Sequence, residues 1–270
     1  MTTVLCVPQW QGSGLGDSPR LAAGAHRTAE LVPADSRITV PVLDTGGKPD
    51  AGVRGLDVLT TNLRLTYDAL TQIDDDVVIT TGGDCAVDLA PIALARLRYG
   101  DRLTVLWIDA HPDLYTPQTL RSGSFHGMVL RTLLGEGPAA LVPAQPLVPE
   151  QVIIAGERAG SPSEHEYLER AGIRRYGVDT FGQALDGVTG PVYLHIDLDV
   201  LEPTEFGSLG YPEPDGVRVD QLIELVSGAD HVIGAAITEH MPTGQATDEA
   251  DSEVIRRLTA ALCSRLDHQA

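Results

Sequence analysis

Cysteine is scarce in this chain: three residues among 270, far apart, at Cys6, Cys85 and Cys263. An odd number of widely separated cysteines is not the pattern of a disulfide framework. We therefore expect a soluble protein of a reducing compartment, the cytoplasm. The amino terminus agrees with this expectation, because it lacks the basic region and long apolar core of a secretory signal peptide.

The sequence also lacks long apolar runs and has few basic residues for its length. No stretch approaches the roughly 20 apolar residues that a membrane-spanning helix needs. The 19 Lys and Arg residues stand against 38 Asp and Glu residues, which gives a formal net charge of −19. Such a charge repels the phosphates of nucleic acids and of anionic membranes. We expect neither a nucleic acid nor a membrane as a partner.

The sequence does contain a regular alternation of short apolar runs and helical patterns. A length of 270 residues with 43% hydrophobic content suits one large domain, so we expect a single domain over residues 1–270. Runs that are apolar throughout are typical of strands covered on both faces, as in a parallel sheet. The alternation predicts a three-layer α/β/α fold with a mostly parallel, doubly wound sheet.

The patterns also predict the individual elements and the places where polar residues gather. Strands are expected at 3–7, 37–40, 77–80, 103–108, 151–155, 172–176, 192–196 and 231–237. Helices, from apolar residues at i, i+3 and i+4, are expected at 55–73, 86–99, 163–171, 219–229 and 248–266. Polar clusters come directly after the third, fourth, seventh and eighth strands. Open α/β sheets bind ligands at the edge where parallel strands end, so we expect these clusters to converge.

Two of these clusters have the character of metal ligands: Asp109-Ala-His111-Pro-Asp113 and Asp197-Leu-Asp199. A carboxylate at the edge of an apolar core needs a cation or dense hydrogen bonding. Several oxygens with one imidazole suit Mn²⁺ better than Zn²⁺. Asp109 and Asp197 can each bridge two ions roughly 3.5 Å apart, with a water between them. The alternative is that these aspartates only cap helices and turns, which does not explain the convergence.

The full set of motifs resembles the ureohydrolase superfamily of arginases and agmatinases, in order and spacing over nearly the whole chain. The matching segments are Gly82-Gly-Asp84-Cys85, the two clusters above, Ser122-Gly-Ser124-Phe-His126-Gly, the Glu-Pro203 that comes after Asp199, and Thr238-Glu239. The resemblance implies two Mn²⁺ ions per chain and a small guanidino compound as substrate. It also implies a homo-oligomer, a trimer or hexamer.

The resemblance further implies a ligand set for each ion. One ion would be bound by Asp109, Asp113, Asp197 and the residue at position 85. The other would be bound by Asp109, His111, Asp197 and Asp199. Position 85 departs from the family, because Cys85 stands where the family has a histidine. A thiolate is softer than Mn²⁺ prefers, so Cys85 is either a direct ligand or a small buried residue beside a weakly held ion.

For catalysis, the resemblance implies that a hydroxide between the ions attacks the guanidinium carbon. Glu239 would bind the guanidinium face and His126 would carry a proton to the departing amine; Asp113 completes the expected catalytic set. These roles are chemically reasonable. A planar cation calls for a facing carboxylate, and a poor amine leaving group needs a proton, which histidine can relay near pH 7.

The part of the pocket that would hold the amino-acid end of the substrate differs from the family pattern. Ser122 is retained, whereas Tyr115 and Ser124 stand in place of asparagines, Ser161 in place of an aspartate and Tyr211 in place of a small hydroxyl residue. All five are candidate substrate-binding residues, together with Glu239. The two tyrosines are either substrate contacts or loop anchors.

For His195 and for the glycine-rich segment 12–16, the sequence favours a structural role over a functional one. His195 lies inside a predicted strand, and we expect it to be a core histidine. The glycine-rich segment 12–16 lacks the spacing of a dinucleotide loop, so we expect it to form a rim of the pocket.

The expected function is hydrolysis of arginine, or of a modified arginine such as hydroxyarginine, to an amine plus urea or a substituted urea. An agmatinase, a guanidino-acid hydrolase or a formimino-glutamate hydrolase is the alternative within this chemistry. A different class is a catalytically decayed, metal-binding regulator of the same fold. Glu239 and His126 speak against it, since a scaffold needs neither.

Overall fold

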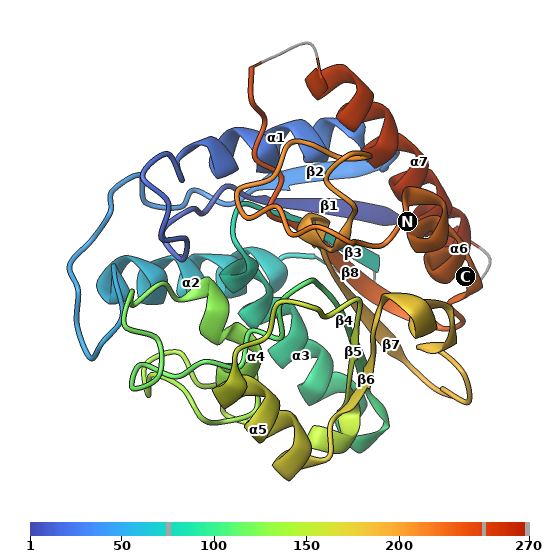
Figure 1. Ribbon diagram of the computed structural model, residues 1–270. Coiled ribbons are helices and arrows are strands. Elements are labelled where there is room, and N and C mark those ends of the chain that lie inside the picture. The colour runs from blue at the N-terminus through green and yellow to red at the C-terminus, as the bar shows by residue number, and fades with distance from the viewer. Residues whose placement is uncertain (74–76, 245–246, 268–270) are drawn as a thin grey trace.

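Eight parallel strands form one sheet in the computed structural model, which describes residues 1–73, 77–244 and 247–267 (Figure 1). The strands are β1 Thr2–Val7, β2 Ser36–Thr39, β3 Val77–Gly82, β4 Thr104–Ile108, β5 Val152–Ala155, β6 Arg174–Tyr176, β7 Val192–Asp197 and β8 Val232–Thr238. Their order in the sheet is β2-β1-β3-β8-β7-β4-β5-β6, and every neighbouring pair is parallel. Each expected strand is present, and the parallel, doubly wound sheet is confirmed.

Helices cover both faces of this sheet, which gives the expected three layers. They are α1 Arg20–Leu31, α2 Leu56–Leu70, α3 Leu89–Tyr99, α4 Val129–Leu133, α5 Pro162–Ala171, α6 Val219–Gly228 and α7 Thr247–Asp267. Helices α1, α6 and α7 pack on one face and α2 to α5 on the other (Figure 1). Within the described ranges, none of the helices is both long and apolar enough to span a bilayer.

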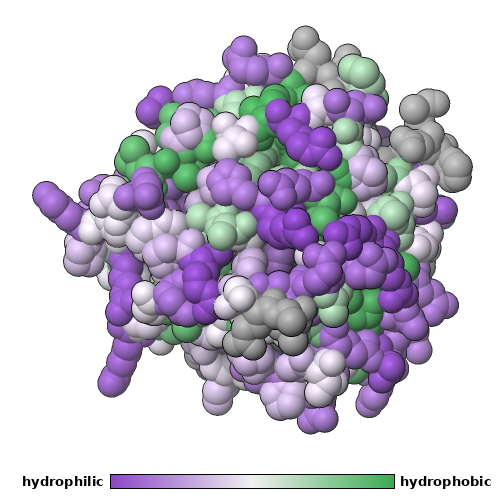
Figure 2. Space-filling view, turned by 90° about the horizontal axis from the view of Figure 1, so that it is seen from above, coloured by the Kyte–Doolittle hydropathy of each residue, from purple (hydrophilic) through white to green (hydrophobic). Residues whose placement is uncertain are grey.

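Each strand of the sheet centre contributes side chains to two separate cores. In β4, Leu106 and Ile108 face the layer of α1, α6 and α7, whereas Val105 and Trp107 face the opposite layer. All four side chains are fully buried, which explains why the run is apolar throughout. The outer surface is different: hydrophilic residues cover much of the face shown in Figure 2, in keeping with the large negative charge.

Helix α1 was not predicted from the sequence. Its buried face consists mostly of small residues, including Gly24, Ala25 and Ala29, which give a weak hydrophobic signal. Gly24 is required by close packing, because a Cβ there would collide with the backbone carbonyl of His240 after β8. The buried residues of α1 do recur at helical spacing, but most of them are small, so the segment was overlooked.

The strand order places the predicted polar clusters together. Strands β3, β8, β7 and β4 are consecutive neighbours, and the four clusters come directly after these strands. Parallel strands end at a common edge, so the clusters begin side by side. The expected convergence is confirmed.

Candidate metal centre

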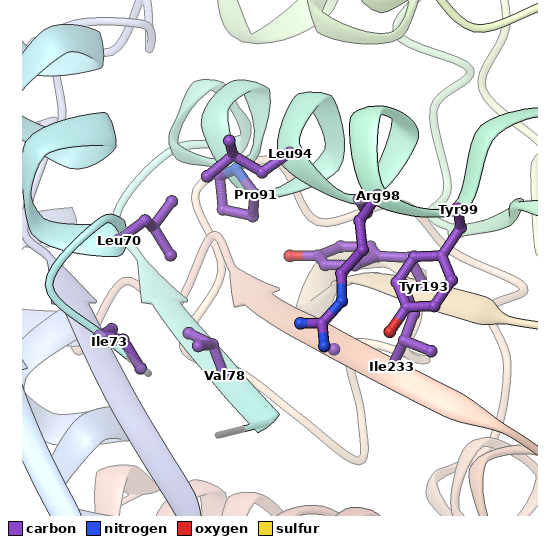
Figure 3. Close-up of a pocket in the computed structure, with 11 residues that line it drawn as sticks. Leu70, Ile73, Val78, Pro91, Leu94, Arg98, Tyr99, Tyr193 and Ile233 are labelled. Carbon is purple, nitrogen blue, oxygen red and sulfur yellow. The ribbon is translucent and has the colours of Figure 1, made fainter. Parts of the chain in front are cut away.

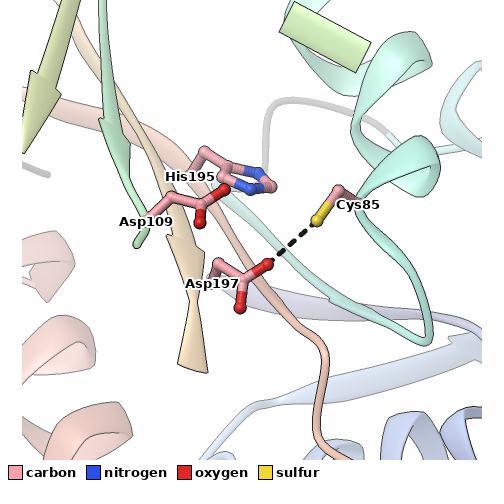
Figure 4. A group of neighbouring side chains, drawn as sticks. All are labelled: Cys85, Asp109, His195 and Asp197. Carbon is pink, nitrogen blue, oxygen red and sulfur yellow. Dashed lines mark hydrogen bonds between the residues drawn. The ribbon is translucent and has the colours of Figure 1, made fainter. Parts of the chain in front are cut away.

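Buried ligand atoms gather at this edge in two adjoining groups. One group contains Cys85, Asp109, His195 and Asp197, whose ligand atoms all lie within 4.8 Å of one another (Figure 4). The other contains Asp109, His111 and Asp199 within the same limit. Asp109 belongs to both groups. Two cations bound here would be neighbours with a shared carboxylate, as in binuclear sites.

Backbone hydrogen bonds hold the carboxylates in place. Asp109 accepts from the amide of His111 at 2.6 Å and from the indole of Trp107 at 3.0 Å. Asp197 accepts from the amide of Asp199 at 2.8 Å. In both motifs the backbone amide two residues after the aspartate donates to that aspartate's carboxylate. This local turn is typical of aspartate in loops.

The charge balance of the edge calls for cations. Burial, together with the neighbouring Asp199, raises the pKa of Asp109 to about 6. Burial and carboxylate neighbours also raise the pKa values of Asp113 and Asp197 well above their usual range. One buried oxygen of Asp113 has no hydrogen-bond partner among the residues described. Divalent cations would supply the missing positive charge, so this donor set fits a metal centre.

The candidate catalytic residues lie next to the metal-ligand groups. His126 Nδ1 is 3.5 Å from Oε1 of Glu239, and Oε2 of Glu239 is buried without a hydrogen-bond partner in the described part of the chain. Burial by itself disfavours the charged imidazole, but the hydrogen bond and charge of Glu239 outweigh it and raise the pKa of His126. A proton on His126 is thereby stabilised beside a carboxylate that has one oxygen left for a ligand.

Two of these acidic residues have an uncommon backbone conformation. Asp113 has φ 52° and Glu239 has φ 61°, in the left-handed region. A side chain in this region costs roughly 1–2 kcal/mol relative to ordinary helical backbone. Strain of this kind is often found at functional sites, where the surrounding structure imposes it.

A cavity of about 320 Å³ opens onto the centre. Most predicted site residues line it: His111, Asp113, Tyr115, Ser122, Ser124, His126, Asp197, Asp199 and Tyr211. Cys85 and Glu239 are buried and contact the lining residues Asp197 and His126. Gly14 of the glycine-rich segment also lines the cavity, in keeping with its interpretation as a pocket rim.

Ser161 is placed differently from the other candidates. Its hydroxyl caps helix α5 and lies 2.8 Å from Oε2 of Glu164, in a reciprocal capping box. Glu164 lines the cavity in its place, as does Arg54. Sequence reasoning missed both residues. Ser161-Pro-Ser-Glu164 has the spacing of a capping box, a signal that the sequence analysis did not use. Arg54 lies in an irregular loop that carries no comparable signal.

A second cavity, of about 150 Å³, lies near the opposite ends of the strands (Figure 3). Apolar side chains such as Leu70, Ile73 and Val78 form much of its lining, together with Tyr193. The acidic residues that resemble metal ligands are not among those lining it. We therefore place the chemistry at the carboxyl ends of the strands.

Comparison with known proteins agrees with this geometry. The chain is 29% identical over 250 residues to the arginase of Bacillus subtilis (strain 168), which covers 82% of this chain and 84% of the relative. It is 34% identical over 173 residues to the N(omega)-hydroxy-L-arginine amidinohydrolase of Streptomyces lavendulae, 61% of each protein.

Solved structures share the fold. An arginase structure from Bacillus subtilis superposes with a TM-score of 0.85 at 23% identity, over 97% of this chain and 98% of the other. Proclavaminate amidino hydrolase from Streptomyces clavuligerus gives 0.75 at 19% identity, over 100% and 92%. The model of the arginase family matches residues 23–264. The convergent ligand groups, the parallel sheet and this match together show that the chain belongs to the arginase family.

Proposed function

We propose that the protein is a manganese-dependent amidinohydrolase acting on arginine or a modified arginine, with hydroxyarginine as the foremost candidate. The products are an amine plus urea or a substituted urea. One observation carries the proposal: a ligand set suited to two cations lies beside Glu239 and His126, at the base of one cavity.

The proposed ligand roles agree with the two groups in part: Asp109 belongs to both, Asp197 belongs to the first only, and Asp113 belongs to neither. Asp109 and Asp197 would contact both ions, Cys85 and Asp113 the first, and His111 and Asp199 the second. Divalent ions, when bound, lower the pKa of water toward neutrality and so supply a nucleophile at physiological pH. The buried carboxylates would hold the ions at the end of the cavity.

Glu239 is suited to bind the guanidinium group. Its carboxylate is 2% exposed, and its partnerless Oε2 is available to accept an N–H from a planar cation. Such charge-assisted hydrogen bonds are stronger than neutral ones and favour a planar orientation. His126, 3.5 Å from Glu239, would pass its proton to the departing amine nitrogen when the C–N bond breaks.

The rest of the cavity lining favours a substrate with a carboxylate. Arg54 is the one Lys or Arg side chain among the described residues that line the cavity. A guanidinium binds a carboxylate in a bidentate manner, and Ser122 and Ser124 add hydroxyl donors in the same cavity. Arginine and hydroxyarginine have this carboxylate, whereas agmatine lacks it. The named activity of the Streptomyces lavendulae relative supports hydroxyarginine.

A substrate panel tests the function. Metal-free protein is reloaded with Mn²⁺ under reducing conditions and given arginine, N-hydroxyarginine, agmatine, guanidinobutyrate and formimino-glutamate, with amine and urea products measured by mass spectrometry. We expect ornithine from arginine or hydroxyarginine. Preference for agmatine or for one of the other acids would favour the alternative hydrolases. A metal-loaded protein that turns over none of the panel would favour the decayed regulator.

We also propose that the chain works as a single catalytic domain over residues 1–270, as a homo-oligomer, in the cytoplasm. The three cysteines are buried and form no disulfide within the described residues, which supports a reducing compartment. The family resemblance supports a trimer or hexamer, and light scattering of the purified protein measures the mass directly.

A further inference from the structure

We propose that His195 is a metal ligand, whose Nε2 completes the position formed by Cys85, Asp109 and Asp197. This inference rests on the proposed function, because it names a ligand of the same centre. It replaces our expectation from the sequence that His195 is only a core residue. Figure 4 shows the imidazole beside Asp109 and Asp197, with Cys85 opposite.

The first argument is the unused nitrogen. His195 is fully buried, and its Nδ1 is 2.8 Å from Oδ2 of Asp88. Nε2 is buried too and has no hydrogen-bond partner in the described residues. A buried nitrogen without a hydrogen-bond partner is energetically unfavourable. A cation shared with the two neighbouring aspartates would remove this cost.

The second argument is the tautomer. With the Asp88 carboxylate as its partner, Nδ1 carries the proton and donates it, which leaves the Nε2 lone pair for a ligand. Histidines that bind metals usually donate their other ring nitrogen to a carboxylate in this way. The hydroxyl of Tyr193 donates a hydrogen bond of 2.6 Å to Oδ1 of Asp88 and so fixes this carboxylate. Tyr193 also lines the second cavity (Figure 3).

The third argument is rigidity. The sheet pairs Trp107 of β4 with His195 of β7, and the two rings stack with centroids 3.5 Å apart and planes 10° apart. The same Trp107 donates its indole N–H to Asp109. The imidazole is therefore fixed on its face by Trp107 and at its edge by Asp88. A ligand held in this way loses little conformational entropy when an ion binds.

An unpartnered ring nitrogen would not be sufficient evidence alone. His240 is also buried, with Nδ1 2.9 Å from the Thr28 hydroxyl and Nε2 without a partner among the described residues. His240 belongs to neither ligand group, whereas His195 is grouped with two carboxylates and a thiol. With His195 included, each group has one imidazole, His195 in the first and His111 in the second.

Matched variants test the assignment. His195→Asn keeps an amide donor toward Asp88 but has no atom at the Nε2 position, whereas His195→Gln places an amide near Nε2. His240→Asn is the control for loss of a buried imidazole. Each protein is made metal-free, reloaded with Mn²⁺, dialysed and analysed for metal by mass spectrometry, and its fold is checked by circular dichroism and melting.

We expect His195→Asn to bind the more weakly held Mn²⁺ at least about tenfold less tightly than wild type. His195→Gln should lose less, and His240→Asn should retain the wild-type metal content. Folded His195→Asn protein with wild-type metal content and affinity would overturn the assignment.

A second measurement does not depend on how His195 variants fold. In the His111→Asn variant, pulsed EPR of bound Mn²⁺ should still detect hyperfine coupling to a directly bound histidine nitrogen, and ¹⁵N-histidine labelling should alter it. Absence of that coupling while Mn²⁺ is bound would overturn the assignment and leave the proposed function intact. Failure of the wild-type protein to bind Mn²⁺ would overturn both.

Discussion

The thiol of Cys85 donates a hydrogen bond to Oδ2 of Asp197 over 3.0 Å, inside the buried ligand group. Burial, and then the charge of Asp197, raises the pKa of this thiol well above its usual range. Without a cation, Cys85 therefore keeps its proton. A divalent ion at this position would have to displace that proton if sulfur is to bind, so the affinity of the position should increase with pH.

Substitutions at Cys85 distinguish a ligand from a packing residue. If the sulfur binds metal, Cys85→Ala should weaken the first ion about tenfold or more, and Cys85→His should strengthen it, since nitrogen suits Mn²⁺ better than sulfur. Metal content after dialysis measures both effects. Cys263→Ala, a buried cysteine in α7, is the control. Equal retention by all four proteins would show that Cys85 only packs.

Glu239→Gln should keep both metals and lose most activity, because it removes the negative partner of the guanidinium while preserving shape. Loss of a buried charge-assisted pair costs about 2–5 kcal/mol, or a factor of roughly thirty to several thousand in kcat/KM. Steady-state kinetics and metal analysis of the same preparation measure the two properties. Glu224→Gln, on the exposed side of α6, is the matched control. Turnover near the wild-type rate would exclude Glu239 as the guanidinium partner.

Arg54→Met should raise KM for arginine and hydroxyarginine roughly tenfold to a hundredfold, because a hydrogen bond to a charged group contributes about 1.5–3 kcal/mol. Any activity toward agmatine, which has no carboxylate, should change little. Arg64→Met, on the exposed face of α2 and paired with Asp68, controls for loss of surface charge. An equal loss for all substrates would contradict a carboxylate-binding role for Arg54.

His240 should oppose folding in mild acid, against the stabilisation that protonation of the buried Asp109, Asp113 and Asp197 gives the metal-free protein over the same range. Burial lowers the pKa of His240 from 6.5 to about 4, so between these values the unfolded chain binds more protons than the folded one. Lowering the pH from 7 to 5 should therefore cost about 2 kcal/mol through this group. Urea denaturation of metal-free protein measures the change. The free energy of unfolding of the His240→Gln variant, minus that of the wild type, should rise by about 2 kcal/mol from pH 7 to pH 5. A difference that does not change with pH would exclude His240 as the cause.

The sequence predicted those features of the fold and the site that a single motif or a single apolar run is enough to indicate. The apolar runs predicted the strands, and the motif around Asp109 and Asp197 predicted the metal-ligand edge. His195 could not be identified in this way, because its environment depends on the β4–β7 pairing that brings Trp107 alongside. It also depends on Asp88, at the end of the short 3-10 helix that follows β3. Arg54 likewise reaches the cavity through the course of an irregular loop. The positions of such residues in the site depend on tertiary contacts, which cannot be predicted from the periodicity of the sequence.

The left-handed backbone at Asp113 and Glu239 has an evolutionary consequence. Glycine adopts this conformation without a steric penalty, so replacing either residue by glycine would relieve strain and remove a buried carboxylate oxygen that lacks a partner in the described structure. In a lineage released from selection for the proposed activity, glycine at either position would no longer be opposed by function. The two acidic residues are therefore positions at which the proposed activity, rather than backbone preference, accounts for the side chain.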